Sequence, residues 1–468
     1  MTRQDRKPRK APSAPAAPSA PSSDRPARSA RPARAAKPAG SVGSAGSKGP
    51  GTDRSRGQRP PSELPRSALA GLRGGAIEQS GAPETARLLA HALDVVDDDS
   101  TREWTHGFHT YPARFHPVLV RRLLEDLPPK ARVLDPFAGS GTTLIETALK
   151  GGAALGVDLN PLAVELAWLK ATPWGATWRA TLLAAAEQVV ARVTEETRAS
   201  RRRSAKTSSS PPRAETRYDD PRYYPPHVYR ELVALRQAID GVSEPALRRA
   251  LLLILSSIIV KVSRQRSDTD EALVERAIPR GAPTRHFAHR TEELLRHMAE
   301  YAAAVPLGTP TPKVRLGDAR HLDHVRDGSI ERVITSPPYL GTYDYTRHHR
   351  RRFGWLGLDP APLERGEIGA RRGGGDPARA LGRWERDVRA YLGEIARVLR
   401  PGAWAYLLLG DSVVGQEAVI GYEVVERAAP AMGLTLVARA SQQRPEPLGP
   451  TRGVHRERRE HLLALQRG

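Results

Sequence analysis

The chain of 468 residues is strongly basic, because 73 Lys and Arg against 52 Asp and Glu give a formal net charge of +21. Such an excess favours a polyanionic partner, and nucleic acid is the commonest one. The chain contains no cysteine, which excludes disulfides, Cys-ligated zinc, iron–sulfur clusters and a thiol nucleophile. No apolar stretch reaches the roughly 18 residues of a membrane span, and the N-terminus lacks an apolar signal core. The sequence therefore predicts a cytoplasmic protein without a membrane partner.

Residues 1–75 are predicted to be a disordered basic tail. Residues 1–60 hold ten prolines and 14 Lys and Arg against three Asp, but only Met1 and Val42 among the large apolar residue types. This segment buries too little apolar surface to offset the entropy of ordering. We expect the tail to act either as a solubilising leader or as an electrostatic tether to nucleic acid.

Beyond the tail, helical spacing predicts helices over 83–97 and 117–127. A strand, a Gly-rich turn, a helix, a second strand and a second helix follow over 131–170, the clearest α/β signal of the chain. Amphipathic helices are then expected over 175–200, 226–239, 244–263 and 285–304. From residue 313 onward, strands are expected over 314–318, 332–336, 403–410, 434–440 and 461–466, with helices over 383–399 and 422–432.

Helices that alternate with strands predict a mainly parallel sheet covered by helices on both faces. The simplest organisation is one α/β domain in two parts, residues 76–171 and residues 311–468. A helical insert over 172–310 separates the two parts and is a candidate for recognition of the target.

The first motif, in VLDPFAGSGTTLIETA, places a Gly-rich turn between a strand and a helix. Gly139 and Gly141 allow a ligand to approach the backbone closely, and the helix N-terminus offers unpaired N–H groups and a positive dipole end. Asp158 ends the second strand, where a carboxylate can bond both hydroxyls of a ribose. The dinucleotide pattern G-x-G-x-x-G fails at Leu144, and no Gly-Lys-Ser/Thr of a Walker A loop follows.

This turn resembles the D-x-F-x-G-x-G-T loop of S-adenosylmethionine-dependent methyltransferases, and the resemblance implies S-adenosyl-L-methionine as the cofactor. The cofactor-binding residues that it assigns are Asp135, Pro136, Phe137, Gly139, Gly141, Thr142, Asp158 and Asn160. Further along, GDAR supplies Asp318 and Ala319, where the family places an acid that bonds the adenine amino group. The structural alternatives are an ordinary Gly turn and a solvated loop.

The second motif is Ser336-Pro337-Pro338-Tyr339, at the end of a predicted strand. Paired prolines cannot extend a central strand, and their missing N–H groups leave the Pro337 carbonyl free to accept a hydrogen bond. Ser336 adds a hydroxyl acceptor and Tyr339 a flat face for stacking. Together these groups suit an exocyclic amino group on a planar base, whereas the structural alternative is a proline turn that ends a strand.

This motif resembles the (D/N/S)-PP-(Y/F) motif of amino-methyltransferases, and its Ser-Pro-Pro-Tyr form is most similar to the cytosine-N4 DNA enzymes. The resemblance implies a Rossmann-like class I methyltransferase fold with a mainly parallel seven-stranded sheet. It further implies DNA as the partner, a nucleoid-associated location, a role in restriction–modification and no metal. The implied reaction is an in-line displacement by the amino nitrogen of a flipped-out base, cytosine N4 being favoured over adenine N6.

Two other functions stay open at this point. An RNA enzyme similar to the tRNA guanine-N2 methyltransferases would share the motif order, although those enzymes often carry DPPYG where this chain has SPPYL. A nucleic-acid-binding protein that does not catalyse is the third hypothesis. Carbon-5 cytosine methylation is excluded, because the family that performs it needs a cysteine. The sequence predicts no oligomeric state, and it leaves open whether the insert reads a DNA sequence.

One further segment, HTYPARFHP over 109–117, resembles the segment that closes over the methionine end of the cofactor in DNA amino-methyltransferases. Tyr111, Phe115 and His116 are its candidate contacts. A hydrophobic staple at a helix N-terminus accounts for Phe115 equally well.

Three basic or polar segments are candidates for contact with nucleic acid. The run TRHHRRRFGW over 346–355 suits phosphate contacts, although a solvated helix face is the alternative. Asp344 just before it either orients the base or caps a helix. Residues 261–270 and the predicted loop over 442–453 are expected to line or enter a nucleic-acid groove.

Overall fold

The computed structural model describes residues 74–95, 99–112, 114–204, 218–268, 270, 272–370, 376–447 and 457–468. All of them belong to one compact unit, Pro65–Gly468. The predicted basic tail therefore lies outside the described residues, apart from Gly74 and Gly75. None of the helices in the described part is both long and apolar enough to cross a membrane.

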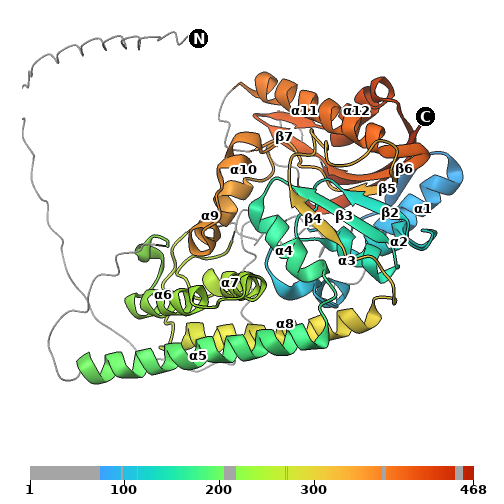
Figure 1. Cartoon of the computed structure of the whole chain (residues 1–468). Coiled ribbons are helices and arrows are strands. Elements are labelled where there is room, and N and C mark those ends of the chain that lie inside the picture. Colours follow the sequence, from blue (N-terminus) through green and yellow to red (C-terminus); the bar gives the residue numbers. More distant parts are fainter. Residues whose placement is uncertain are drawn as a thin grey trace, which may run out of the picture. The chain divides into compact units, whose positions relative to one another are not determined.

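The core of the fold is one sheet in the order β1-β9-β10-β6-β5-β2-β3-β4 (Figure 1). Neighbours from β6 to β4 run parallel, whereas β10, β9 and β1 add antiparallel pairs. The strands are β1 (Ile77–Gly81), β2 (Arg132–Asp135), β3 (Ala153–Asp158), β4 (Lys313–Leu316), β5 (Ile330–Thr335), β6 (Leu399–Gly410), β9 (Leu434–Pro447) and β10 (Glu457–Arg467).

This sheet confirms the predicted α/β class, but the expected number of seven strands is wrong. The sheet has eight strands, because β1 pairs with β9 as an additional edge strand. Its sequence, IEQSG, leaves four of five residues exposed, so it shows none of the alternation that marks a half-buried strand.

Helices cover both faces of the sheet, as predicted. α1, α2, α3 and α4 pack on one face, and α11 and α12 pack on the other. The helices are α1 (Pro83–Leu93), α2 (Pro117–Leu123), α3 (Thr142–Leu149), α4 (Pro161–Ala171), α5 (Ala176–Ser204), α6 (Pro226–Asp240), α7 (Pro245–Ile259), α8 (Ala282–Ala304), α9 (Tyr345–Leu356), α10 (Ala361–Gly366), α11 (Pro377–Val398) and α12 (Gly421–Ala428). The helix α10 and the hairpin β7 (Ser412–Val414) with β8 (Glu417–Val419) were not predicted, and α9 corresponds to the helix that was given as the alternative for residues 346–355.

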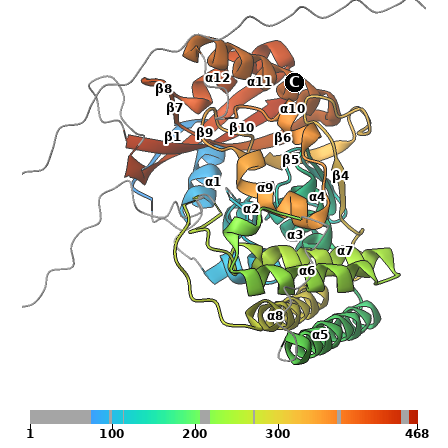
Figure 2. The ribbon, with the colours of Figure 1, turned by 90° about the vertical axis from the view of Figure 1, so that its left-hand side faces the viewer.

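The predicted helical insert folds as α5, α6, α7 and α8, which lie beside one another in both ribbon views (Figures 1 and 2). Its core is continuous with that of the α/β part of the chain, since Leu166 of α4, Ile254 of α7 and Trp355 of α9 belong to one buried cluster. The insert is therefore packed against the segment that follows the second motif.

The basic run over 346–355 is the main difference from the sequence analysis. Arg351 is 7% exposed and donates to Gln265 Oε1 at 2.5 Å, and Arg352 is 2% exposed and bound to Asp268. The prediction of phosphate contacts is wrong for these two arginines, because their guanidinium groups join α9 to the insert. Arg347 and Arg350 of the same helix remain exposed.

The prediction of a loop over residues 442–453 is also partly wrong. β9 continues to Pro447 because Gln442 and Arg444 pair with Glu460 and Arg458 of β10. The remainder of that predicted loop, residues 448–453, lies outside the described residues.

The start of α8 depends on a carboxylate from another helix, which gives a test of the packing of the insert. Glu231 of α6 is buried and accepts hydrogen bonds from Gly281 N at 3.0 Å, Thr284 N at 3.0 Å and Thr284 Oγ1 at 2.6 Å. Glu231→Ala leaves these donors unpaired, so we expect the free energy of unfolding in urea to fall by about 2 kcal/mol. Glu187→Ala, at an exposed position of α5, is the control and should change it by less than about 0.5 kcal/mol. Equal effects of the two substitutions would show that Glu231 does not hold α8.

Candidate active site

Both motifs meet at one cavity at the carboxyl edge of the parallel strands, which is where ligands bind in open α/β sheets. The predicted residues that line it are Asp135, Pro136, Phe137, Gly139, Thr142, Asp158, Asn160, Asp318, Ala319, Ser336 and Pro338. Gly141, Pro337 and Tyr339 are not among the lining residues.

The Gly-rich turn is shaped by two glycines with different tasks. Gly139 has φ of 48° and Gly141 has φ of 89°, a region that side chains with a Cβ disfavour. A Cβ at Gly141 would also lie 3.0 Å from Cα and Cβ of Ala167. Gly141 therefore allows α3 to pack against α4, which explains why it does not line the cavity.

Asp158 fixes the turn from the neighbouring strand. Its carboxylate accepts from Gly139 N at 2.7 Å and from Asn160 N at 2.8 Å, and burial raises its pKa to about 6. An ionised carboxylate offers about four acceptor positions. The two that remain are available to the hydroxyls of a ribose.

Asn160 connects the cofactor loop to segments on both sides of it. Its Oδ1 accepts from Leu162 N at 3.0 Å and caps α4, while its Nδ2 contacts Tyr111 Oη at 3.3 Å and His349 Nδ1 at 2.9 Å. Tyr111 in turn stacks on Tyr345, with ring centroids 6.0 Å apart. This network holds α9 and the 109–117 segment at the mouth of the cavity.

A short hydrogen bond joins the two motifs directly. Thr335, the last residue of β5, donates from Oγ1 to Asp135 Oδ1 at 2.6 Å, and Phe137 N donates to the same oxygen at 3.1 Å. Asp135 is 2% exposed, and burial raises its pKa to about 6 while the Thr335 hydrogen bond acts to lower it. Because Thr335 immediately precedes Ser336, this bond sets the distance between the second motif and the cofactor loop.

Within the second motif, Ser336 and Pro338 face the cavity. Ser336 Oγ donates to Leu408 O at 3.2 Å and lies 3.4 Å from Tyr339 Oη, and Pro338 O accepts from Trp384 Nε1 at 3.1 Å. The Tyr339 ring is 6% exposed and packs on Gly410 of β6, where a Cβ would come within 2.6 Å of it. Stacking of Tyr339 on a base therefore stays a prediction that requires this ring to turn out from β6.

The 109–117 segment contributes Tyr111, Arg114 and Phe115 to the wall of the cavity. His116 instead accepts from Val118 N at 3.3 Å and caps α2. Asp344 similarly accepts from Arg347 N at 2.9 Å and caps α9. Of the two roles predicted for Asp344, the structure therefore shows the helix cap, and orientation of the base stays a prediction.

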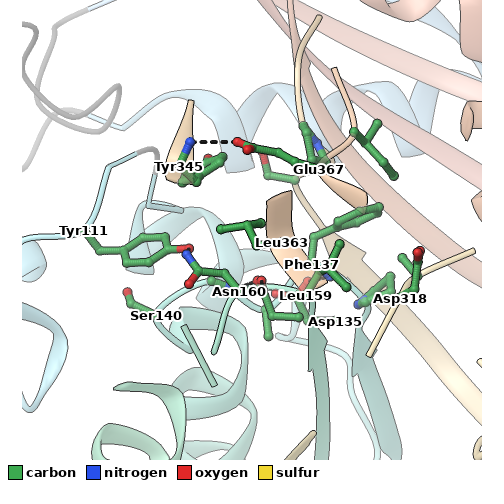
Figure 3. Close-up of a pocket in the computed structure, with 18 of the residues that line it drawn as sticks. Tyr111, Asp135, Phe137, Ser140, Leu159, Asn160, Asp318, Tyr345, Leu363 and Glu367 are labelled. Carbon is green, nitrogen blue, oxygen red and sulfur yellow. Dashed lines mark hydrogen bonds between the residues drawn. The ribbon is translucent and has the colours of Figure 1, made fainter. Parts of the chain in front are cut away.

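The predicted adenine site lies at one end of the cavity. Asp318 lies there, opposite Tyr111 and Ser140, with Phe137, Leu159 and Leu363 between them (Figure 3). The Asp318 carboxylate is already engaged by Arg320, which also binds Asp387 at 2.7 Å and Gly366 O at 2.9 Å. Contact of Asp318 with an adenine amino group remains a prediction.

The residues fit the parts of S-adenosylmethionine in sequence along the cavity. Phe137, Leu159 and Leu363 form an apolar wall suited to a planar base, and Asp158 provides acceptors for a ribose. At the opposite end, Arg114 lines the cavity beside Ser140 and lacks a carboxylate partner among the described residues, which suits the carboxylate of the methionine group. Within the same residues, no group of three or more His, Asp or Glu is arranged to hold a metal ion.

Several lining residues were missed from the sequence, namely Arg114, Ser140, Tyr345, Leu363 and Glu367. Glu367 accepts from Tyr345 N at 2.7 Å and from Thr346 Oγ1 at 3.2 Å, which closes the segment after α10 over the cavity (Figure 3). Arg114 lies within the 109–117 segment. A charged residue between apolar and aromatic neighbours was a signal in the sequence from which Arg114 could have been predicted as a site residue. Leu363 and Glu367 carry no pattern of their own, because only the tertiary fold brings α10 to the cavity.

Sequence comparison finds relatives of this chain among DNA methyltransferases. Residues 93–168 match a DNA methylase family model. Type II methyltransferase M.MvaI of Kocuria varians is 26% identical over 280 residues, which are 55% of this chain and 59% of that protein. Type II methyltransferase M.MjaII of Methanocaldococcus jannaschii is 32% identical over 85 residues, which are 17% of this chain and 15% of that protein. The chain thus spans less than two thirds of the length of either relative.

Among solved structures, the rRNA methyltransferase aviRa of Streptomyces viridochromogenes aligns with a TM-score of 0.31 and 13% identity, covering 80% of this chain and 96% of that one. TrmN from Thermus thermophilus aligns with a TM-score of 0.28 and 13% identity, covering 76% and 49%. The family match and the two Type II methyltransferases confirm the resemblance of the chain to S-adenosylmethionine-dependent DNA amino-methyltransferases, with S-adenosylmethionine as the cofactor.

Proposed function

We propose that this chain is a DNA methyltransferase that transfers a methyl group to an exocyclic amino nitrogen, with cytosine N4 favoured over adenine N6. The observation that carries this proposal is the meeting of the cofactor loop and the Ser-Pro-Pro-Tyr motif at one cavity, joined by the hydrogen bond between Thr335 and Asp135. The similarity to two Type II methyltransferases supports DNA as the substrate. The preference for cytosine rests on the Ser-Pro-Pro-Tyr form of the motif.

The residues of the chain act mainly by positioning. S-adenosylmethionine, when bound, supplies a methyl group activated by its positively charged sulfur. The Ser336 hydroxyl lines the cavity and is the first proposed acceptor for an amino hydrogen of the base. The carbonyl of the next residue, Pro337, is the proposed second acceptor, although Pro337 is not among the lining residues. Together they direct the nitrogen lone pair toward the methyl group. The sulfur–methyl bond breaks as the nitrogen–methyl bond forms, and the methylated nitrogen then loses one proton to solvent. The transfer therefore needs no covalent intermediate on the protein. A base in a duplex hides its amino group, so the target must be flipped out of the stack.

The direct test supplies purified protein and S-adenosylmethionine with genomic DNA or total RNA in separate reactions. Products are digested to nucleosides and identified by mass spectrometry. N4-methylcytosine or N6-methyladenine in DNA is the expected result and identifies the target atom. N2-methylguanosine in RNA alone would replace this proposal with an RNA methyltransferase, and cofactor binding without any product would favour a protein that binds nucleic acid without catalysis.

Ser336→Ala tests the acceptor role of the second motif. Removal of the hydroxyl leaves one amino hydrogen without an acceptor, so we expect kcat to fall roughly 100-fold while the Kd for S-adenosylmethionine is unchanged. Ser257→Ala is the matched control, because Ser257 also donates to a backbone carbonyl, Ile254 O at 2.7 Å, but lies on α7. A parallel loss of cofactor affinity in Ser336→Ala would assign Ser336 to the cofactor instead.

Thr335→Val tests the bond between the motifs without a change in side-chain shape. Burial raises the pKa of Asp135 to about 6 and Thr335 acts against this rise, so loss of the hydroxyl raises that pKa further. Because ionised Asp135 holds the turn, we expect the acid limb of the kcat profile to move to higher pH, together with a lower plateau. A plateau that falls with an unmoved acid limb would mean that Thr335 has only a structural role.

A further inference from the structure

Three buried polar side chains form a hydrogen-bonded chain at the end of β6, next to the second motif. His461 of β10 lies between the other two: its Nε2 is 2.9 Å from Asp411 Oδ1 and its Nδ1 is 2.8 Å from Ser441 Oγ. All three side chains are buried. We call them the 411–461–441 network. No step of the proposed reaction uses these residues, so their presence beside the site needs an explanation.

The register of the strands brings the network together. His461 of β10 pairs with Leu409 of β6 on one side and with Ser441 of β9 on the other, and residues that pair across neighbouring strands point to the same face of a sheet. Asp411 is the first residue after β6, and its N donates to Arg459 O of β10 at 2.9 Å. The side-chain bond from Asp411 to His461 adds to this backbone bond. The network therefore ties the end of β6 to β10 and β9.

A Ser, a His and an Asp in this order of hydrogen bonds can activate a serine nucleophile, but here the serine is not placed for that chemistry. Ser441 is buried within β9 and does not line the cavity. The ring of Tyr422, in the first turn of α12, lies against the His461 ring with centroids 4.8 Å apart. The Ser441 hydroxyl is therefore held away from a substrate, and the network acts on the protein itself.

The end of β6 is also where the second motif rests. Ser336 Oγ donates to Leu408 O at 3.2 Å, and the Tyr339 ring fills the space that the missing side chain of Gly410 leaves. Both side chains that are proposed to handle the base thus rest on the last three residues of β6, directly before Asp411. By contrast, the hydrogen bonds that fix the Gly-rich turn come from β3 and β5.

We propose that His461 and Asp411 are positioning residues for the second motif, because their hydrogen bond fixes the end of β6 and thereby the place of Ser336 and Tyr339 relative to the base. The buried carboxylate of Asp411 needs a fixed donor, which Nε2 of His461 supplies. Ser441 holds the ring from its other nitrogen, so that Nε2 keeps pointing to Asp411. The role in methyl transfer rests on the proposed function, whereas the fixing of β6 does not.

The first experiment separates the two hydrogen bonds of His461 by two substitutions. The side-chain nitrogen of Gln takes the place of Nε2, and that of Asn takes the place of Nδ1. His461→Gln should therefore keep the bond to Asp411 and retain most of kcat, whereas His461→Asn loses that bond and should lower kcat roughly tenfold or more. The Kd for S-adenosylmethionine should be unchanged in both variants, because the Gly-rich turn is held from other strands.

His227→Asn is the matched control, since His227 also uses Nε2 to contact a residue distant in the sequence, Ile278 O at 2.8 Å, but lies on α6. It should leave kcat unchanged. Asp411→Ala removes the same bond from its other end, so it should match His461→Asn, and the double variant should show no further loss. Equal loss of kcat in His461→Gln and His461→Asn, or additive losses in the double variant, would overturn the positioning role.

The second experiment does not depend on the reaction. Hydrogen–deuterium exchange followed by mass spectrometry reports how often backbone amides open. In His461→Asn, the amides over 405–411 and 339–342 should exchange faster than in the wild type, while those over 133–143 should not change. Uniformly faster exchange would mean that the substitution only lowers the stability of the whole fold. Unchanged exchange over 405–411 would mean that the network does not fix β6, and either result overturns the proposal.

The two proposals fail in different ways. If the wild type transfers methyl groups to DNA and both His461→Asn and Asp411→Ala retain its full kcat, the positioning role is wrong and the proposed function stands. If the wild type modifies neither DNA nor RNA, the proposed function fails and the role of the network in methyl transfer fails with it. The exchange measurement then still decides whether the network fixes the end of β6.

Discussion

The hydrogen bond from Thr335 Oγ1 to Asp135 Oδ1 is the contact on which the arrangement of this site depends. It joins β5 to β2, two neighbouring parallel strands whose residues are far apart in the sequence. A buried carboxylate needs fixed donors, and here the donors are the residue before the second motif and the backbone of the first. The same carboxylate is thus bound to both motifs, and a displacement of either one removes one of its donors.

Buried ionisable groups of both signs lie at or near the cavity. Burial raises the pKa of Asp135 and of Asp158, which line it, and lowers the pKa of Lys170, which contacts the lining residue Ser140. These opposite shifts have the same cause, because the fold keeps all three groups out of water at a cost in free energy. Asp135 and Asp158 offset part of this cost through the hydrogen bonds that they accept from Thr335 and from the Gly-rich turn.

The sequence was sufficient to predict those parts of the fold that depend on the residues of one short segment alone. The Gly-rich turn, the acid at the end of β3 and the prolines that end β5 each follow from backbone geometry at that position, and the structure brings them together because parallel strands share one edge. The edge strand β1 could not be predicted, because its burial depends on a partner in β9. Tyr339 was expected to be open to the cavity, but the missing side chain at Gly410 provides a place for its ring.

The arginines of α9 show how the insert bears on the site. A run of basic residues beside a base-binding motif resembles a phosphate contact in sequence, yet Arg351 and Arg352 point into the insert and bind Gln265 and Asp268 there. Two buried guanidinium groups with fixed partners are costly to separate, so α9 moves only together with the insert. Because α9 follows the second motif and Asn160 contacts His349 on it, any displacement of the insert would reach the Gly-rich turn and the second motif at the same time. The insert is therefore connected to the cavity through packing and hydrogen bonds alone.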